Sequence, residues 1–282
     1  MHGSGYTRDH LRIRAAFHRE YAEQDVDFYA WVVDHVPWQG GEHVLDVGCG
    51  IGLYVPYYLR HTSHLVGVDI SPAMLQTLRE SVSFPGALLV ARAEALPFPP
   101  NTFHVVFANH VLFFVDDVER ALTEAHRVLR PGGWFVAATY TEESLAQVYR
   151  VHARALHRIG RMPTRARHLR FPLEKGAEVV QRVFPSVQKD RLPNAFLFPS
   201  VEVAMRYYLS GPVREVVGPP LSPAEREALL AEVRTRIARE IQRHGVWRVS
   251  KDAGVILARK EEGVTIKGGD LEDEVGLDRR GL

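Results

Sequence analysis

The sequence predicts an α/β fold, namely a Rossmann-like doubly wound sheet of about seven strands with helical cap insertions. Short apolar runs alternate with amphipathic segments between residues 44 and 140, as in parallel sheets covered by helices. The first of these runs ends in a turn with glycine at alternate positions, Gly48-Cys49-Gly50-Ile51-Gly52. Long helical patterns follow Tyr140. Sheets of this kind bind ligands at the carboxyl ends of their strands, where the glycine turn lies.

The first half of the chain gives the clearest element boundaries. Residues 7–36 carry an imperfect apolar face at helical spacing, which predicts a helix ended by Pro37. Val44–Val47 predicts a strand buried on both faces, and Leu65–Val68 predicts a second one. Ser71 then begins a helix, because serine followed by proline is a favourable N-cap and first-turn pair.

The fourth and fifth strands follow the same alternation. Phe103–Asn109 predicts the fourth strand, and residues 118–129 predict a helix closed by Pro131-Gly132. Trp134–Tyr140 predicts the fifth strand. Phe184–Leu192 and Val246–Ala258 have strand character and would supply the last two strands.

These elements divide the chain into three predicted parts. Residues 1–40 form an N-terminal helical segment, and residues 41–260 form one domain with cap insertions at about 141–183 and 198–243. Residues 261–282 are rich in Gly, Asp and Glu and predict a flexible charged tail. We expect the cap helices to cover the active site.

The glycine turn and Asp69 together indicate a ligand that contains adenosine. Glycines without Cβ atoms allow a ligand to lie against the backbone. Asp69 ends the next strand, roughly 20 residues beyond the turn, where a carboxylate can accept hydrogen bonds from both hydroxyls of a ribose. A dinucleotide-binding turn needs its third glycine at the position of Leu53, which argues against NAD or FAD.

Val44–Gly52 with Asp69 resembles motifs I and II of the class I S-adenosylmethionine (SAM) dependent methyltransferases. Three later stretches extend the resemblance to the small-molecule, UbiE-like branch of that family: Ala93–Phe98, Phe103–Asn109 and Leu129–Gly133. The chain departs from the family at Arg92 and His104, where Asp is common. The Arg92 departure puts only the adenine contacts in doubt.

The resemblance implies SAM as the cofactor and assigns contacts to it. The methionine part would contact Asp46 and the backbone of Gly48, Gly50 and Gly52, and the ribose would bond to Asp69. The adenine would lie against Ile70 and the backbone of Ala93 and Glu94. Asn109 would lie beneath the sulfonium region. Three of these side chains have a structural alternative. Asp46 could cap the turn, Ile70 could be core, and Asn109 could satisfy backbone groups at a strand end.

The acceptor side is less defined by the sequence. Tyr21, His110 and Tyr140 are candidates to face the substrate, and His110 is placed where a base could remove a proton, although packing is the commoner role of a histidine. No catalytic residue is assigned, because a sulfonium is already an activated methyl donor. We expect no metal site, since His61-x-x-His64 lacks a nearby acidic or cysteine ligand.

The sequence therefore predicts a SAM-dependent methyltransferase acting on an oxygen, nitrogen or carbon nucleophile of a small molecule. An RNA methyltransferase is an alternative, because seven arginines and no acidic residue occupy residues 150–170. A SAM-binding protein without transferase activity is a third class, suggested by Arg92. An NAD-dependent oxidoreductase is a distant fourth.

Composition sets the remaining limits. The 282 residues, 46% of them hydrophobic, can bury a full core. No leader or bilayer-spanning run is evident, so we expect a cytoplasmic protein without membrane association. Cys49 is the only cysteine, which excludes an intrachain disulfide. Only five of the 35 basic residues are lysine. The sequence predicts neither the acceptor nor the oligomeric state.

Overall fold

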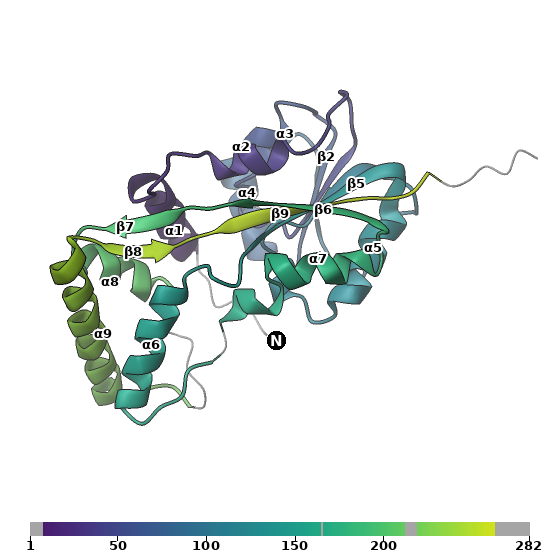
Figure 1. The fold of residues 1–282 in the computed structure, drawn as a ribbon. Helices are drawn as coiled ribbons and strands as arrows, with labels where there is room; N and C mark the ends of the chain where they lie inside the picture. The colour runs from purple at the N-terminus through teal and green to yellow at the C-terminus, as the bar shows by residue number, and fades with distance from the viewer. Residues whose placement is uncertain (1–7, 165, 212–218, 263–282) are drawn as a thin grey trace, which may run out of the picture.

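The computed structural model describes residues 8–164, 166–211 and 219–262, and its centre is a seven-stranded sheet of order β3-β2-β1-β4-β5-β9-β6 (Figure 1). The strands are β1 (Val44–Val47), β2 (Leu65–Asp69), β3 (Ala87–Val90), β4 (Phe103–Phe107), β5 (Leu129–Tyr140), β6 (Ser186–Leu192) and β9 (Ala253–Arg259). Strands β1 to β5 are parallel, whereas β9 runs antiparallel to both β5 and β6. The predicted fold class is confirmed.

Helices cover both faces of this sheet (Figure 1). On one face, apolar side chains of α5 (Val118–Val128) and α7 (Leu173–Gln181) pack with Leu45, Val106 and Phe135 of the sheet. On the other face, α2 (Phe28–Val33) and α3 (Val55–Tyr58) pack over Val44, Val105 and Val136. Opposite faces of one strand thus enter two cores, as expected for a buried parallel sheet.

Local capping explains where two sheet helices begin. The Ser71 hydroxyl accepts a hydrogen bond from Met74 N at the start of α4 (Pro72–Ser81). Asp117 does the same for Arg120 N at the start of α5, at 2.9 Å. Both caps satisfy amides that have no partner within the helix.

A separate apolar core forms the cap. It joins α1 (Arg8–Glu20), α6 (Ala146–Arg158), α8 (Val201–Leu209) and α9 (Pro223–His244) to a two-stranded sheet of β7 (Ala195–Phe198) and β8 (Trp247–Ser250). Buried aromatic rings from α1, β7 and α8 meet at its centre, among them Phe17, Phe196 and Tyr207. The cap lies at one end of the main sheet (Figure 1).

The prediction of one helix over residues 7–36 was wrong, because α1 ends at Glu20 and α2 begins at Phe28. The intervening segment pairs with β7. Tyr21 O accepts a hydrogen bond from Leu197 N at 2.8 Å, and Glu23 N donates to Ala195 O at 2.7 Å. The Asp27 side chain then caps α2 by accepting from Ala30 N.

The apolar run Val246–Ala258 forms two strands in two sheets instead of one. Lys251 and Asp252 separate β8, which belongs to the cap, from β9, which belongs to the main sheet. Lys251 N donates to Asn194 O just before β7. The chain therefore passes between the main sheet and the cap sheet at neighbouring positions, once from β6 to β7 and once from β8 to β9. β7 lies between the predicted strand Phe184–Leu192 and the insertion predicted from about residue 198, where no strand was expected.

The remaining elements lie near the boundaries of the cap. Two short 3₁₀ helices are η1 (Leu112–Phe114) and η2 (Arg167–Arg170). Helix α7 falls in the range predicted as cap but packs on the main sheet. The predicted tail lies mostly outside the described residues. In the described part of the chain, no helix has both the length and the apolar character needed to cross a bilayer.

Candidate functional site

Four strand ends bring most of the predicted site residues to one edge of the sheet. Gly48 follows β1, Asp69 ends β2, Asn109 and His110 follow β4, and Tyr140 ends β5. Because β1, β2, β4 and β5 are parallel neighbours, these carboxyl ends lie side by side.

The glycine turn has a backbone that only glycine adopts without strain. Gly48, Gly50 and Gly52 have φ values of 73°, 54° and 80°, which lie in the left-handed region. A Cβ at Gly48 would lie 2.4 Å from Val111 Cγ2. A Cβ at Gly50 would instead meet nothing nearer than Gly48 O at 4.0 Å, so this side of the turn faces open space.

Asp69 is held against this turn by two backbone amides. Its Oδ2 accepts from Gly50 N at 2.9 Å and its Oδ1 from Ser71 N at 2.8 Å. Burial raises the pKa of Asp69, and the two hydrogen bonds oppose that rise. Each oxygen keeps a free lone pair. The next residue, Ile70, is a large apolar side chain left 60% exposed, which the core alternative does not explain.

Asp46 is a buried carboxylate without a cation. It is 3% exposed, and burial, followed by the charge of Asp69, raises its pKa to about 7. A hydrogen bond from the Tyr58 hydroxyl partly offsets this rise. No Lys, Arg or His among the described residues forms an ion pair with Asp46. A cationic ligand group would therefore stabilise its charged form.

Asn109 links the ends of two strands to α3. Its Nδ2 donates to the Tyr58 hydroxyl at 3.1 Å, and its Oδ1 accepts from Ala138 N at 2.9 Å. Tyr58 in turn bonds to Asp46, so the three side chains form one buried chain of hydrogen bonds. Asn109 thus satisfies a backbone amide near a strand end, which is the structural alternative given for it above.

The backbone of Ala93 and Glu94 follows β3 at the same edge. The Glu94 carboxylate pairs with Arg92 at 3.0 Å, and its carbonyl accepts from Arg120 Nε at 3.2 Å. Arg92 also reaches Asp116 at 3.4 Å. The positive charge of Arg92, where the family commonly has Asp, is therefore balanced by two carboxylates of the chain itself.

Aromatic rings surround the carboxyl edge near β4 and β5. The His110 ring lies 4.8 Å from that of Tyr140 and 5.5 Å from that of Phe28. Burial lowers the pKa of His110 to about 4, so the ring is neutral near pH 7. Its Nδ1 has no partner among the described residues, and neither has the buried Tyr54 hydroxyl. Buried polar atoms of this kind normally have partners.

The third substrate-facing candidate lies elsewhere. The Tyr21 ring contacts Phe17 at 5.0 Å and Phe198 at 6.3 Å, within the cap core. His110 and Tyr140 are brought together and Tyr21 packs apart from them. Within the described ranges, no group of three His, Cys, Asp or Glu side chains could hold a metal ion.

Three residues of this edge were missed from the sequence: Tyr54, Tyr58 and Lys251. The first two stand four residues apart directly after the glycine turn, a helical spacing that places both on one side of α3. Lys251, one of five lysines, interrupts an apolar run. A lysine within an apolar run could have predicted both the end of a strand and a buried charge.

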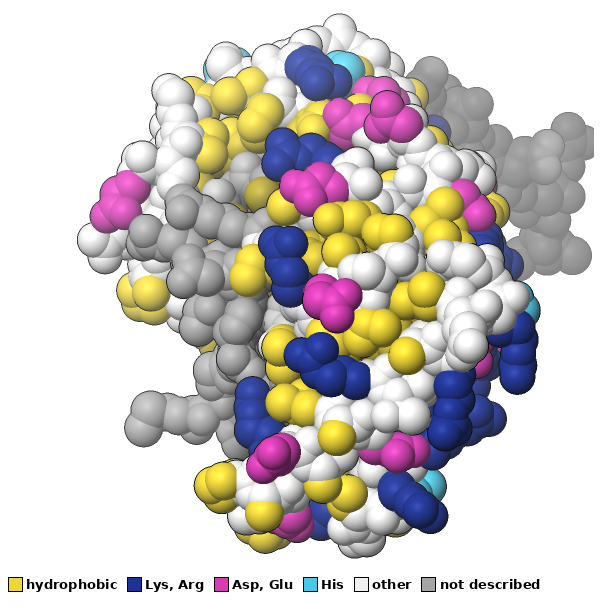
Figure 2. Space-filling view, turned by 90° about the vertical axis from the view of Figure 1, so that its left-hand side faces the viewer, with side chains coloured by type: hydrophobic (Ala, Val, Ile, Leu, Met, Phe, Trp, Pro, Cys, Tyr) yellow, Lys and Arg dark blue, Asp and Glu magenta, His cyan; other side chains and the backbone are white. Residues whose placement is uncertain are grey.

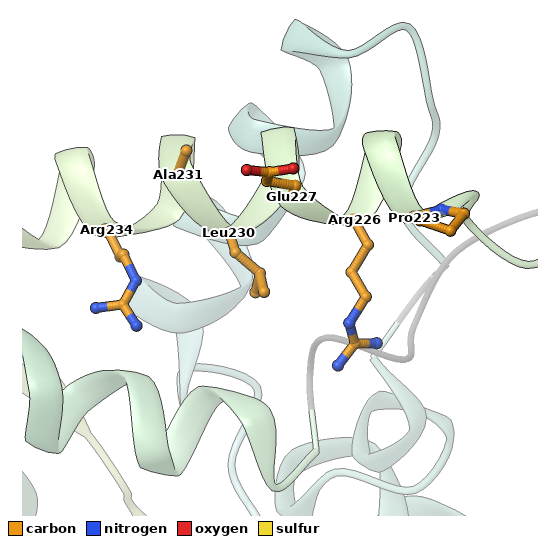
Figure 3. Close-up of a pocket in the computed structure, with 6 residues that line it drawn as sticks. All are labelled: Pro223, Arg226, Glu227, Leu230, Ala231 and Arg234. Carbon is orange, nitrogen blue, oxygen red and sulfur yellow. The ribbon is translucent and has the colours of Figure 1, made fainter.

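A hollow of about 420 Å³ on α9 is separate from this edge. Figure 3 shows its lining residues, Pro223, Arg226, Glu227, Leu230, Ala231 and Arg234. All six come from one cap helix, whereas the site residues described above come from the strand ends of the main sheet (Figure 1).

Comparison with known proteins identifies relatives of the central part of the chain. Residues 45–137 match the family model described as "Methyltransferase domain". The chain is 34% identical over 128 residues to a demethylmenaquinone methyltransferase of Symbiobacterium thermophilum, covering 43% of this chain and 47% of that protein. It is 35% identical over 134 residues to the ubiquinone/menaquinone biosynthesis C-methyltransferase UbiE of Enterobacter sp., covering 43% and 53%. The chain thus spans about half the length of these curated relatives.

The fold extends beyond the matched segment. The crystal structure of a putative methyltransferase from an antibiotic biosynthesis pathway of Anabaena variabilis aligns with a TM-score of 0.59. That alignment covers 83% of this chain and 97% of the other at 17% identity. At this identity the likeness establishes the fold only.

Proposed function

We propose that this chain, whose residues 45–137 match a methyltransferase-domain model, is a class I SAM-dependent methyltransferase that transfers the methyl group of SAM to an oxygen, nitrogen or carbon nucleophile of a small molecule. The observation that carries the proposal is the Gly50–Asp69 arrangement. Open space beside Gly50 adjoins a carboxylate with free lone pairs, and an exposed Ile70 follows it. A flat adenine suits Ile70, and two ribose hydroxyls suit Asp69.

Asp46 supports the assignment of the methionine end. Its carboxylate is buried and unpaired among the described residues, and the α-ammonium of SAM is a cation that could restore its charge. Burial raises the pKa of the Tyr54 hydroxyl, and the charge of the nearby Asp46 adds to that rise. The unpartnered Tyr54 hydroxyl could then bond the carboxylate of the same ligand.

The chain's own contribution to the reaction is positioning and exclusion of water. A bound sulfonium supplies an activated methyl group, so no protein nucleophile is needed. The rings of Phe28, His110 and Tyr140 would keep the acceptor dry and aligned at the strand ends. With a pKa of about 4, His110 is a weak base. We therefore assign it to orienting the acceptor by a hydrogen bond at Nδ1.

RNA methylation receives less support. Arg161 pairs with Glu225, Arg167 lies over the ring of Phe114, and Arg170 donates to Val115 O, so part of the arginine-rich segment is used in packing. Arg150, Arg154 and Arg158 are exposed on α6. Figure 2 shows Lys and Arg side chains interspersed with Asp and Glu on the cap side of the molecule. A steeply salt-dependent affinity for tRNA fragments would revive this alternative.

Calorimetry with SAM and its demethylated product, S-adenosylhomocysteine, tests the proposal. Wild-type protein should bind both, and Asp69→Asn should weaken binding by roughly tenfold or more, since a charged acceptor of hydrogen bonds is lost. Glu178→Gln removes an exposed carboxylate on α7 and should change nothing. Absence of binding by the wild-type chain would refute the proposal, and binding without transfer to any acceptor would indicate a SAM-binding protein.

A further inference from the structure

Lys251 is a buried cation at the edge of the sheet where the methyl acceptor would bind. It precedes β9, whose first residue, Ala253, pairs with Tyr140 at the end of β5. The adjacent Asp252 O accepts from Thr141 N at 3.2 Å. Lys251 is only 9% exposed, and burial lowers its pKa to about 8.

The ammonium of Lys251 has no carboxylate partner in the described part of the chain. Its Nζ lies 3.4 Å from His18 Nδ1 and 5.0 Å from the centre of the Phe196 ring. The neighbouring Asp252 is occupied by Arg191 and by Asn194 N. Buried charges are normally paired, because removing an ion from water is costly. An anion from outside the chain would supply the missing partner.

Other groups around Lys251 also favour an anion. Burial lowers the pKa of His18, His110 and His168, and the charge of Arg14 lowers each of them further. The charge of Lys251 also lowers the pKa of His18. Arg14 itself donates to the Tyr207 hydroxyl at 3.2 Å. Positive charge from Arg14 on α1 therefore acts on three histidines from different elements, and positive charge from Lys251 acts on one of them.

Unpartnered polar atoms occur at the same edge. His168 is 6% exposed with no partner for Nε2, and its ring lies 5.7 Å from that of Tyr140, which in turn contacts His110. Further buried atoms without a partner among the described residues follow β5 or end β8, namely the hydroxyls of Thr141, Ser144 and Ser250. Each can donate a hydrogen bond to an anionic oxygen.

We propose that the methyl acceptor is a small anion whose carboxylate or phosphate group binds Lys251 and is hydrogen-bonded by the neighbouring histidines and hydroxyls. This inference rests on the proposed function, because it names the class of acceptor for that site. The Phe196 ring lies against Lys251 Nζ, so the surroundings of the charge are partly apolar.

Binding of benzoate and of inorganic phosphate tests the inference without requiring turnover. With the chain saturated by S-adenosylhomocysteine, calorimetry at pH 7 should detect at least one of the two anions and no binding of benzamide, the neutral analogue of benzoate. Lys251→Met should weaken anion binding by about tenfold to a hundredfold, the usual loss for a hydrogen bond to a charged group. Lys251→Arg should retain binding, and Lys189→Met, on the exposed face of β6, should match the wild type.

The two anions identify the chemistry. Benzoate alone would indicate a carboxylate acceptor, and phosphate alone would indicate a phosphate ester. Equal affinity of the wild type and Lys251→Met for both anions would overturn the inference, as would binding of neither anion to the wild type.

Two measurements separate this inference from the proposed function. The Lys251 and Lys189 variants should bind S-adenosylhomocysteine as the wild type does, whereas a wild-type chain that does not bind it contradicts the methyltransferase assignment itself. If Lys251→Met does not fold, reductive methylation with ¹³C-formaldehyde labels the five lysines for NMR. A saturating bound anion should then raise the pKa of the Lys251 signal, and an unchanged pKa would contradict the inference.

Discussion

Replacing Asp46 by asparagine should stabilise the folded chain. The pKa of Asp46 rises from 3.8 to about 7 in the folded protein, and each unit corresponds to about 1.4 kcal/mol. Ionised Asp46 therefore costs the fold about 4 kcal/mol at pH 8. The cost is absent below the unfolded-state pKa and grows as pH rises towards the folded-state pKa, because the folded chain keeps the proton longer.

The pH dependence gives a sharper test than the absolute value. Between pH 5 and pH 8, linkage predicts that the stability advantage of Asp46→Asn grows by about 2 to 3 kcal/mol. Any constant effect of the substitution on hydrogen bonding to Tyr58 cancels in this difference. Titrating groups that do not interact with Asp46 contribute to both proteins alike.

Urea denaturation of both proteins at pH 5 and pH 8, followed by circular dichroism, measures this difference. Asp25→Asn, which removes an exposed carboxylate, is the matched control. An equal stability difference between Asp46→Asn and wild type at the two pH values would refute the assignment of Asp46 as a buried, unpaired carboxylate.

Three further predictions concern the residues of the proposed cofactor site. SAM binding should release a proton below about pH 7 and become stronger as pH rises to that value, because the α-ammonium of SAM favours ionised Asp46. Calorimetry in buffers of different ionisation enthalpy measures the proton release. Binding without proton release at pH 6 would contradict the prediction. Gly48→Ala should destabilise the fold by about 2 kcal/mol or more, since its Cβ would meet Val111 at 2.4 Å. Gly50→Ala should destabilise the fold only by its backbone strain, about 1 kcal/mol, yet it should weaken SAM binding. Urea denaturation measures the stability of the two glycine variants and calorimetry measures their SAM binding. Equal losses of stability in Gly48→Ala and Gly50→Ala would contradict the prediction.

The central sheet was predictable because its signals are local. Val44–Val47 is apolar except for Asp46 and is followed by glycine, Leu65–Val68 is followed by aspartate, and the structure places strands at both. The same locality explains the glycine turn, whose residues need positive φ in a short stretch. Residues contributed by the ends of parallel strands could therefore be assigned to one edge before any contact was known.

The cap and the acceptor side were less predictable because they depend on contacts between distant residues. Residues 21–27 interrupt the predicted first helix and form hydrogen bonds with β7. Asn109 meets Tyr58, 51 residues away, so its use within the fold was one of two open alternatives. Lys251 approaches His18 across 233 residues, and no periodic pattern in the sequence contains that pairing.

A structure of the chain bound to S-adenosylhomocysteine would test the proposed cofactor site itself. In that complex the ribose hydroxyls should bond to Asp69, the adenine should lie on Ile70, and the amino group of the ligand should lie nearest Asp46. A nucleoside bound elsewhere, or a turn at Gly50 closed by side chains in the complex, would contradict it.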